Sequence, residues 1–354
     1  SGSVLYCLVR ADGDAAADRR LRERLTGPDF PHLAAAYPAG RLIAVAADFS
    51  RPRLGLAPAR WAALTEQIAE VHHCGAEVHL TAGYRRLAPP NVGGTRQLLT
   101  LAEETARHGG RPVPFHFVST LAVFLDAHSA GHPDVDETTP ISMATAGPLG
   151  YTRTKAAAER EVIQAHDRGV TATIMRPGLV TGHSDTGRTS SSDLLVPLLR
   201  ASMALGAIPD RTQAIPAQAV DLVARDIAAL SAVSWPHAQA FHLVRPVPLP
   251  LTEALAALGR AGNRLDILPR DDWWQRVNAR FAHRDIAPLI SQGLLAPRML
   301  GLGSSALPTF HSDHTWSVLH TAGVTHPELD DAYFDRLVEG LPLAYGSAVG
   351  QEAR

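Results

Sequence analysis

The sequence predicts an α/β protein built on a doubly wound parallel sheet, with a smaller and mainly helical lobe. Over the first half of the chain, short apolar runs alternate with longer helical segments, which is the pattern of βα units. Polar residues follow several of these runs directly, at the strand ends where parallel sheets bind their ligands. The 354 residues are 45% hydrophobic, which is ample for a sizeable core.

The first half of the chain alternates regularly between the two kinds of element. The run at Val4–Val9 is short, apolar and without polar alternation, which is typical of a buried strand. The predicted strands are Val4–Val9, Leu42–Ala46, a short strand leading to Cys74, Phe115–Val118 and Thr173–Met175. The predicted helices are Ala15–Leu25, Trp61–Val71, Gly94–His108 and Tyr151–His166.

The pattern changes after Pro177. Loops rich in Gly, Ser and Thr lead to an apolar helix at Leu194–Leu205, and Phe241–Val244 is a late strand. Helices predominate from Leu251 onward. We therefore expect a dinucleotide-binding type of domain in residues 1–177 and a substrate-binding lobe in residues 178–354, with segments at about 214–245 returning to the first domain.

Composition excludes several functional classes. The net charge of −2 gives no basis for binding nucleic acid. The two cysteines, Cys7 and Cys74, argue for a reducing compartment and against a disulfide framework. The sequence has no signal peptide and no apolar run long enough to span a membrane, so we expect no membrane partner and a cytoplasmic location.

The seventeen histidines suggest a metal site. His72-His73-Cys74 stands where a buried strand should end, and His311-Ser-Asp-His314 has the spacing of metal ligands. No second cluster accompanies either group in the sequence. We therefore expect structural or surface roles for both groups and predict no metal site.

The strongest chemical signal is Tyr151-Thr-Arg-Thr-Lys155. A tyrosine and a lysine four residues apart on a helix share one face, and the lysine charge is expected to lower the pKa of the phenol. The phenol then delivers a proton to a carbonyl oxygen. The hydroxyls of Ser119 and Thr120, at the end of a neighbouring strand, complete a donor set of the kind that nicotinamide-dependent carbonyl reductases use.

Further motifs resemble a specific family, the terminal thioester reductase domains of nonribosomal peptide and polyketide synthases and of carboxylic acid reductases. These belong to the extended short-chain dehydrogenases/reductases, whose sheet is Rossmann-like. The similar segments cover almost the whole chain: Cys7-Leu-Val-Arg10-Ala11, Asp48 with Pro52–Leu56, Asn91-Val-Gly-Gly-Thr95, Val118–Val123, Arg176-Pro177-Gly178, Asp330 and Leu337–Leu341.

The resemblance implies roles for individual residues. Thr120, Tyr151 and Lys155 would be the catalytic triad, with Tyr151 as the proton donor and Lys155 also on the nicotinamide ribose. Arg10 and Arg20 would hold the 2′-phosphate of NADP(H), a task that suits guanidinium groups. The remaining implied cofactor-binding residues are Asp48 at the adenine, Cys74, Gly75 and Ala76 along the cofactor, and Asn91, Ser119, Pro177 and Gly178. Val180, Gly182 and Asp193 would mark the entry to the substrate lobe.

One departure from the family concerns the N-terminal side. The family opens with a strand, a Gly-x-x-Gly-x-x-Gly turn and a helix that hold the cofactor pyrophosphate. Here the first strand and the Gly-rich loop are absent, and Ser1-Gly-Ser3 directly precedes what corresponds to the second strand. Either a segment precedes Ser1 in the parent polypeptide, which we expect, or the phosphate loop has been lost.

The expected reaction is the NADPH-dependent release, as an aldehyde or further as an alcohol, of an acyl or peptidyl chain bound to a phosphopantetheinylated carrier protein. The protein would be a monomer or part of a multidomain synthase. Three alternatives remain: a redox-silent relative that releases the chain by cyclisation, another extended reductase or epimerase acting on sugar nucleotides, and a non-catalytic binding domain.

Overall fold

A computed structural model describes residues 3–26, 40–168, 170–190, 193, 195–210, 214–235, 237–281 and 307–341. The chain divides into two compact units. Unit 1 comprises Ser1–Val118, Leu149–Ile174 and Trp235–Gln239, and unit 2 comprises Ser119–Pro148, Met175–Ser234 and Ala240–Arg354. The predicted division at residue 177 stays a prediction; the units change between Ile174 and Met175, and Ser119–Pro148 falls in unit 2.

Parallel strands form two sheets. β1 (Leu5–Val9) pairs in parallel with β2 (Leu42–Ala46), and Val9 lies opposite Ala46. A four-stranded sheet has the order β11-β6-β4-β3. Its strands are β3 (Val71–His73), β4 (Val113–Val118), β6 (Val170–Pro177) and β11 (Gln239–Leu243). The predicted α/β class with parallel strands is confirmed, and among the described strands β3 stands at a sheet edge.

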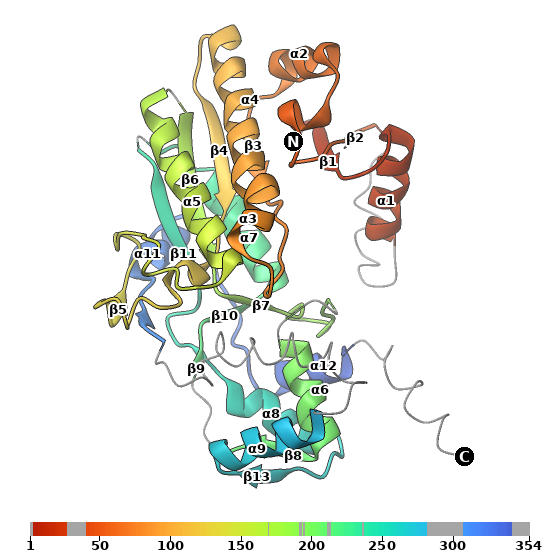
Figure 1. Ribbon diagram of the computed structural model, residues 1–354, viewed down its shortest axis with the longest axis vertical. Coiled ribbons are helices and arrows are strands. Elements are labelled where there is room, and N and C mark those ends of the chain that lie inside the picture. Colours follow the sequence, from red (N-terminus) through yellow and green to blue (C-terminus); the bar gives the residue numbers. More distant parts are fainter. Residues whose placement is uncertain are drawn as a thin grey trace. The chain divides into compact units, whose positions relative to one another are not determined.

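The helices of unit 1 pack along these strands. They are α1 (Asp14–Thr26), α2 (Pro58–Gln67), α3 (Tyr84–Ala88), which continues through a π-helical turn at Pro89–Gly93, α4 (Gly94–Gly109) and α5 (Gly150–Ala165). In Figure 1, α4 and α5 lie side by side along β4 and β6. Arg96 of α4 and Glu161 of α5 form an ion pair at 2.6 Å, and the Trp61 indole donates to Glu104 at 2.6 Å, which joins α2 to α4.

One predicted helix is wrong in its extent. The sequence predicts a helix over Trp61–Val71, but α2 ends at Gln67, and Ile68 is already extended with φ −75° and ψ 144°. Val71 begins β3 and lies opposite Phe115 of β4. A β-branched residue with a strand neighbour gains more from the sheet than from one further helical turn, so tertiary pairing decides the boundary.

Unit 2 combines helices with pairs of very short strands. The helices are α6 (Leu195–Leu205), α7 (Val220–Ser231), α8 (Leu251–Arg260), α9 (Arg270–Phe281), α11 (Asp313–Thr321) and α12 (Asp331–Glu339). The strand pairs are β5 (Asp134–Val135) with β14 (Thr309–Phe310), β7 (Leu179–Thr181) with β10 (Ala217–Ala219), β8 (Ala207–Pro209) with β13 (Asp266–Leu268) and β9 (Ala214–Ile215) with β12 (Leu249–Pro250). The helices expected within residues 282–306 lie outside the described residues.

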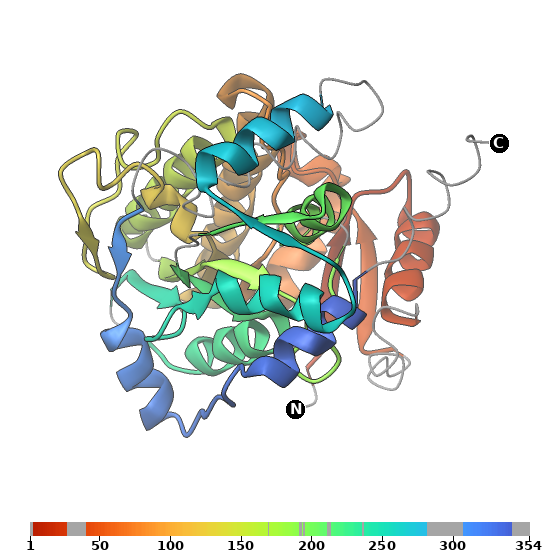
Figure 2. The ribbon, with the colours of Figure 1, turned by 90° about the horizontal axis from the view of Figure 1, so that it is seen from below.

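An apolar core holds these elements of unit 2 together. Leu199 of α6, Leu258 of α8 and Tyr333 of α12 are fully buried in one cluster. In Figure 2, α12 (blue) lies beside α8 (teal), and Arg260 of α8 pairs with Asp335 of α12 at 2.7 Å. Within the described part of the chain, no helix has the length and apolar character that crossing a bilayer requires.

Candidate cofactor and proton-donor sites

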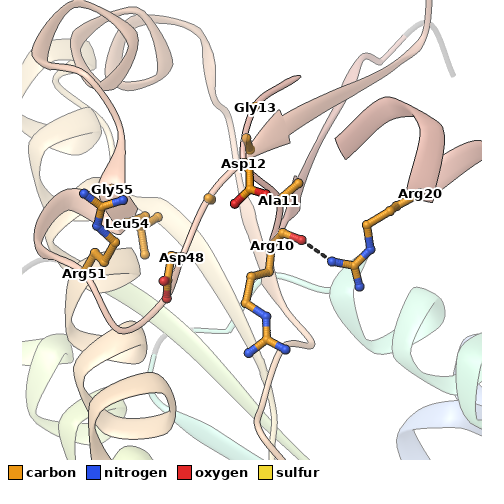
Figure 3. A pocket seen from close by; sticks show the side chains of 11 residues that line it. Arg10, Ala11, Asp12, Gly13, Arg20, Asp48, Arg51, Leu54 and Gly55 are labelled. Atoms are coloured by element: carbon orange, nitrogen blue, oxygen red, sulfur yellow. Dashed lines mark hydrogen bonds between the residues drawn. The ribbon is translucent and has the colours of Figure 1, made fainter. Parts of the chain in front are cut away.

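A polar cavity of about 710 Å³ lies at the carboxyl ends of β1 and β2 (Figure 3). We call it the arginine pocket, after Arg10, Arg20 and Arg51, which line it together with Asp48. Its other lining residues are Ala11, Asp12, Gly13, Ala46, Ala47, Leu54 and Gly55. The structure thus brings Arg10, Arg20 and Asp48 together, as the resemblance implies. Arg51 was missed, although it stands only three residues after Asp48.

The charged groups of the arginine pocket are held in different ways. The Arg20 guanidinium donates to the backbone carbonyl of Arg10, which orients the α1 side chain toward the strand end. Asp48 accepts hydrogen bonds from the backbone N–H and the hydroxyl of Ser50, at 2.8 and 2.6 Å. These bonds lower the pKa of Asp48 below its ordinary value, so the carboxylate is ionised at neutral pH.

These residues fit one end of a nicotinamide dinucleotide. Planar guanidinium groups match a phosphate that carries up to two charges, and an ionised carboxylate accepts hydrogen bonds from ribose hydroxyls or an adenine amine. The sequence contains no Gly-x-x-Gly-x-x-Gly turn, so the fit that these residues show concerns the adenosine phosphate end alone.

The segment after β3 requires a glycine. A Cβ atom on Gly75 would lie 2.2 Å from Cε2 of Phe49, the residue after Asp48. Gly94, at the start of α4, is equally restricted, with a Cβ position 2.7 Å from the Phe49 Cβ. The neighbours Cys74 and Ala76 are exposed. The small residues therefore let Phe49 pack between β3 and α4; their contact with a cofactor stays a prediction.

Asn91 is a buried structural link within unit 1. Its side-chain oxygen accepts from the Glu77 N–H at 2.7 Å, and its amide donates to the Glu77 carbonyl at 3.0 Å and to the Thr154 hydroxyl at 3.0 Å. The amide group thus joins the segment after β3 to α5. The predicted cofactor contact stays a prediction, and the bonds that Asn91 makes are ones that position its neighbours.

Lys155 is a buried cation. Its side chain is 2% exposed, its ammonium donates to the Val118 carbonyl at 2.7 Å, and the Phe117 ring centroid lies 4.0 Å from Nζ. Burial lowers the pKa of Lys155 to about 7, against the raising influence of Glu159 and Cys74. Lys155 therefore changes its charge near neutral pH while it is fixed at the end of β4.

Tyr151 lies one turn before Lys155 on α5 and is half-buried. Burial raises the pKa of Tyr151 to about 12, so the lysine does not produce the lowering that the sequence led us to expect. The phenol is held in its protonated form, which is the form that donates. Gly150, just before it, is required because a Cβ there would lie 2.2 Å from the Ala82 carbonyl oxygen.

The two hydroxyl residues after β4 differ in environment and belong to unit 2. Ser119 is 4% exposed, and its hydroxyl has no hydrogen-bond partner among the described residues. Thr120 is half-buried, and its hydroxyl accepts from the Ala122 N–H at 3.2 Å as the cap of a short 3₁₀ helix, Leu121–Phe124. Thr120 stands two residues after Val118, the acceptor of the Lys155 ammonium.

The predicted entry to the substrate lobe lies entirely within unit 2. Pro177 ends β6, and a Cβ on Gly178 would lie 1.9 Å from the Pro216 carbonyl oxygen. Val180 pairs with Gln218 between β7 and β10, and the Gly182 carbonyl accepts from the Tyr333 hydroxyl at 3.2 Å.

Asp193 is the last of these predicted residues. It accepts from the Thr189 hydroxyl at 2.7 Å and from the Leu195 N–H at 2.9 Å, and burial raises its pKa to about 6. The bonds of the entry residues are internal to unit 2, and their contact with a substrate stays a prediction.

A family of NAD-binding proteins, described as male sterility protein, has a model that matches residues 1–230. The chain belongs to this family. Membership in the male sterility protein family confirms the predicted nicotinamide cofactor class and agrees with the charged groups of the arginine pocket. A linear gramicidin synthase of Brevibacillus parabrevis is 29% identical over 95% of this chain, and isonitrile lipopeptide synthase of Streptomyces coeruleorubidus is 30% identical over 92%.

Male sterility family relatives include long multidomain proteins. The chain spans 6% of the gramicidin synthase and 22% of the lipopeptide synthase. Among solved structures, the terminal R domain of the myxalamid PKS-NRPS pathway matches 96% of this chain and 84% of its own length, with a TM-score of 0.82 and 28% identity. The resemblance to terminal reductase domains is thus confirmed. UDP-galactose 4-epimerase, at 14% identity and a TM-score of 0.57, shares the fold alone.

Proposed function

We propose that the protein reduces an acyl or peptidyl thioester with NADPH and releases the chain as an aldehyde. The observation that carries this proposal is the buried ammonium of Lys155. It is bonded to the Val118 carbonyl, two residues before the Thr120 hydroxyl, and it stands one helical turn from the protonated Tyr151. This set suits a reaction that turns a carbonyl oxygen into an oxyanion.

In the proposed reaction, bound NADPH supplies the hydride to the thioester carbonyl carbon. Thr120 and Tyr151 stabilise the charge that develops on the carbonyl oxygen, and the Tyr151 phenol transfers its proton there. The C–S bond of the resulting hemithioacetal then breaks, which gives an aldehyde and a free thiol. The positive charge of Lys155 favours the phenolate that Tyr151 leaves behind, and its ammonium is available to the nicotinamide ribose.

Cofactor choice is proposed to depend on the arginine pocket. Arg10 and Arg20 would pair with the 2′-phosphate that distinguishes NADPH from NADH, and Arg51 would add positive charge on the opposite wall of the pocket. Asp48 would accept from the adenosine. A phosphate is an ion that guanidinium groups recognise in a bidentate manner, so the pocket favours the phosphorylated cofactor.

The thioester is proposed to arrive on the phosphopantetheine arm of a carrier protein. Two similarities support this partner. Related proteins are named as peptide synthases, and a thiolation-reductase di-domain of an archaeal nonribosomal peptide synthetase shares the fold at a TM-score of 0.74. We expect the chain to work as one part of a multidomain synthase or beside a free carrier.

The test is reduction of one acyl group presented in two ways, on its carrier protein and on a short thiol mimic, with NADPH consumption and aldehyde formation both measured. We expect one NADPH oxidised per aldehyde and a higher kcat/KM on the carrier. Equal kcat/KM for both would favour a small-molecule reductase. Release of a cyclised product without NADPH consumption would show that the redox-silent alternative is correct.

A further inference from the structure

Three side chains that can ligate a metal meet on one face of the edge strand β3. Glu70 directly precedes the strand and His72 is its middle residue, so the two lie two residues apart on the same face. His116 of β4 is the register partner of His72 across the parallel pair. The sheet itself therefore places a Glu-x-His segment opposite a third ligand residue, all within unit 1.

The distances within this cluster are short. The His72 Nε2 atom lies 2.8 Å from Glu70 Oε1, and the rings of His72 and His116 are 4.7 Å apart between centroids. One ligand atom from each of Glu70, His72 and His116 lies within 4.8 Å of the other two. A tetrahedral site with metal–nitrogen bonds of about 2.0–2.1 Å needs ligand atoms roughly 3.3 Å apart. Glu70 and His72 are exposed and free to rotate inward by that small amount.

The buried member of the cluster points independently to a ligand. His116 is 3% exposed, and its Nε2 atom has no hydrogen-bond partner among the described residues. Its other ring nitrogen, Nδ1, lies 2.7 Å from the Thr173 hydroxyl of β6. A histidine whose Nδ1–H donates to a neighbour presents a lone pair at Nε2, and this fixed orientation is the usual support of a metal-bound imidazole. A buried nitrogen without a partner carries a desolvation cost that a bound cation removes.

We propose that Glu70, His72 and His116 form a binding site for Zn²⁺ or a similar borderline divalent metal ion. Two imidazoles and one carboxylate are typical zinc ligands, and three protein ligands leave a fourth position for water. The ion would join the edge strand β3 to β4 and replace the Glu70–His72 hydrogen bond. The site is separate from the residues of the arginine pocket and from Tyr151 and Lys155.

The ligand set differs from the groups that the sequence singled out. His73 lies on the opposite face of β3, where its Nε2 is 3.0 Å from the Thr95 hydroxyl, so His72-His73-Cys74 is not a ligand group. His311 lies 3.2 Å from Asp134, and His314 stacks on Phe241. The decisive partner of His72 is 44 positions along the chain, so only strand pairing reveals it.

The experiment is calorimetric titration of the chelator-treated protein with Zn²⁺, without NADPH or thioester, compared with three variants. His116→Asn keeps an amide near the Nδ1 position, which can still bond Thr173, and removes Nε2; His72→Ala removes the exposed ligand. His108→Ala, at the exposed end of α4, is the matched control. We expect one Zn²⁺ site in the wild type and in His108→Ala, and a loss of affinity of about 100-fold or more in the other two, because changes in outer-shell groups alone cost 10–100-fold.

Co²⁺ provides a second measurement. We expect visible d–d bands typical of nitrogen and oxygen ligands in the wild type, absent in His72→Ala, and a thermal stabilisation by Zn²⁺ that this variant lacks. Zn²⁺ affinity unchanged by both ligand substitutions, absence of any Zn²⁺ binding, or a thiolate charge-transfer band from Cys7 or Cys74 would each overturn the proposal. Equal melting temperatures of metal-free wild type and His72→Ala show that the fold is retained. None of these outcomes depends on reductase activity.

Discussion

The arginine pocket and the surroundings of Lys155 are two cationic sites in one unit, and they treat their charges in opposite ways. Arg10, Arg20 and Arg51 are exposed, and they surround an open polar cavity at the ends of β1 and β2. Lys155 is 2% exposed and its charge is bonded to one carbonyl and covered by one aromatic ring. Burial moves the pKa of Lys155 to about 7, whereas guanidinium groups remain charged at any pH that a protein tolerates.

This difference fits two tasks. A pocket that recognises a phosphate needs permanent charges, which remain hydrated until the ligand arrives with charge of its own. A group that assists proton transfer must instead change its charge near the working pH, and desolvation achieves this. Each of the following predictions tests one side of the contrast.

The largest expected effect concerns the phenol beside Lys155. Tyr151→Phe removes the proposed proton donor but no charge, so NADPH binding should stay nearly intact while turnover of a thioester falls by about 10²-fold or more. Stopped-flow reduction together with a cofactor titration measures both quantities. Wild-type turnover in Tyr151→Phe would remove the phenol from the mechanism.

The ionisation of Lys155 should appear in the pH profile. Because its pKa is lowered to about 7, the ammonium is charged below that pH and neutral above it. If the charge is needed, kcat/KM should fall on the alkaline side by up to about tenfold per pH unit. Lys155→Arg keeps a charge, so any activity that it retains should lack this alkaline limb. The same limb in both proteins would assign it to another group.

The arginine pocket is tested by cofactor discrimination. Arg10→Ala should weaken NADPH binding by about 1.5–3 kcal/mol, the value of a charged hydrogen bond, and leave NADH nearly unchanged. Arg24→Ala is the matched control, since Arg24 is an exposed arginine of α1 that does not line the pocket. Equal losses for NADPH and NADH in Arg10→Ala would show that Arg10 does not recognise the 2′-phosphate.

The smallest effect concerns the support of the buried site. Asn91→Ala leaves the Glu77 backbone groups and the Thr154 hydroxyl without their partner, so the free energy of unfolding should fall by about 1–3 kcal/mol. Chemical denaturation measures this loss, and NADPH affinity should change little if the role is structural. A large loss of NADPH affinity without a loss of stability would restore Asn91 as a direct cofactor contact.

Long elements were predictable from the sequence and short ones were not. The strands at Leu42–Ala46 and Val4–Val9 and the helices α4 and α5 were predicted to within a residue or two, because each has enough turns or alternations to show its period. The two-residue strands of unit 2, such as β5 and β9, have no period to detect. Trp61–Val71 failed because the partner of Val71 is Phe115, far along the chain.

Much of the candidate site was predictable for a related reason. Tyr151 and Lys155 share a helix face by spacing alone, and Arg10 and Asp48 each follow a strand whose direction is fixed by parallel pairing. Local spacing and strand order therefore placed these residues. The lowering of the Tyr151 pKa was expected from the lysine charge and did not occur, since burial, which spacing does not show, raises it instead.

The sequence by itself determined the α/β class, the order of the main elements and the residue types that meet at the strand ends. The tertiary structure alone decided which charges are hydrated and which are buried, and which partners meet across strands. Arg10 and Lys155 are both cations in the sequence, yet only packing makes one permanent and the other titratable near pH 7. The pairing of His72 with His116 was likewise decided in space, because a hydrogen-bonded register joins positions that no local pattern connects.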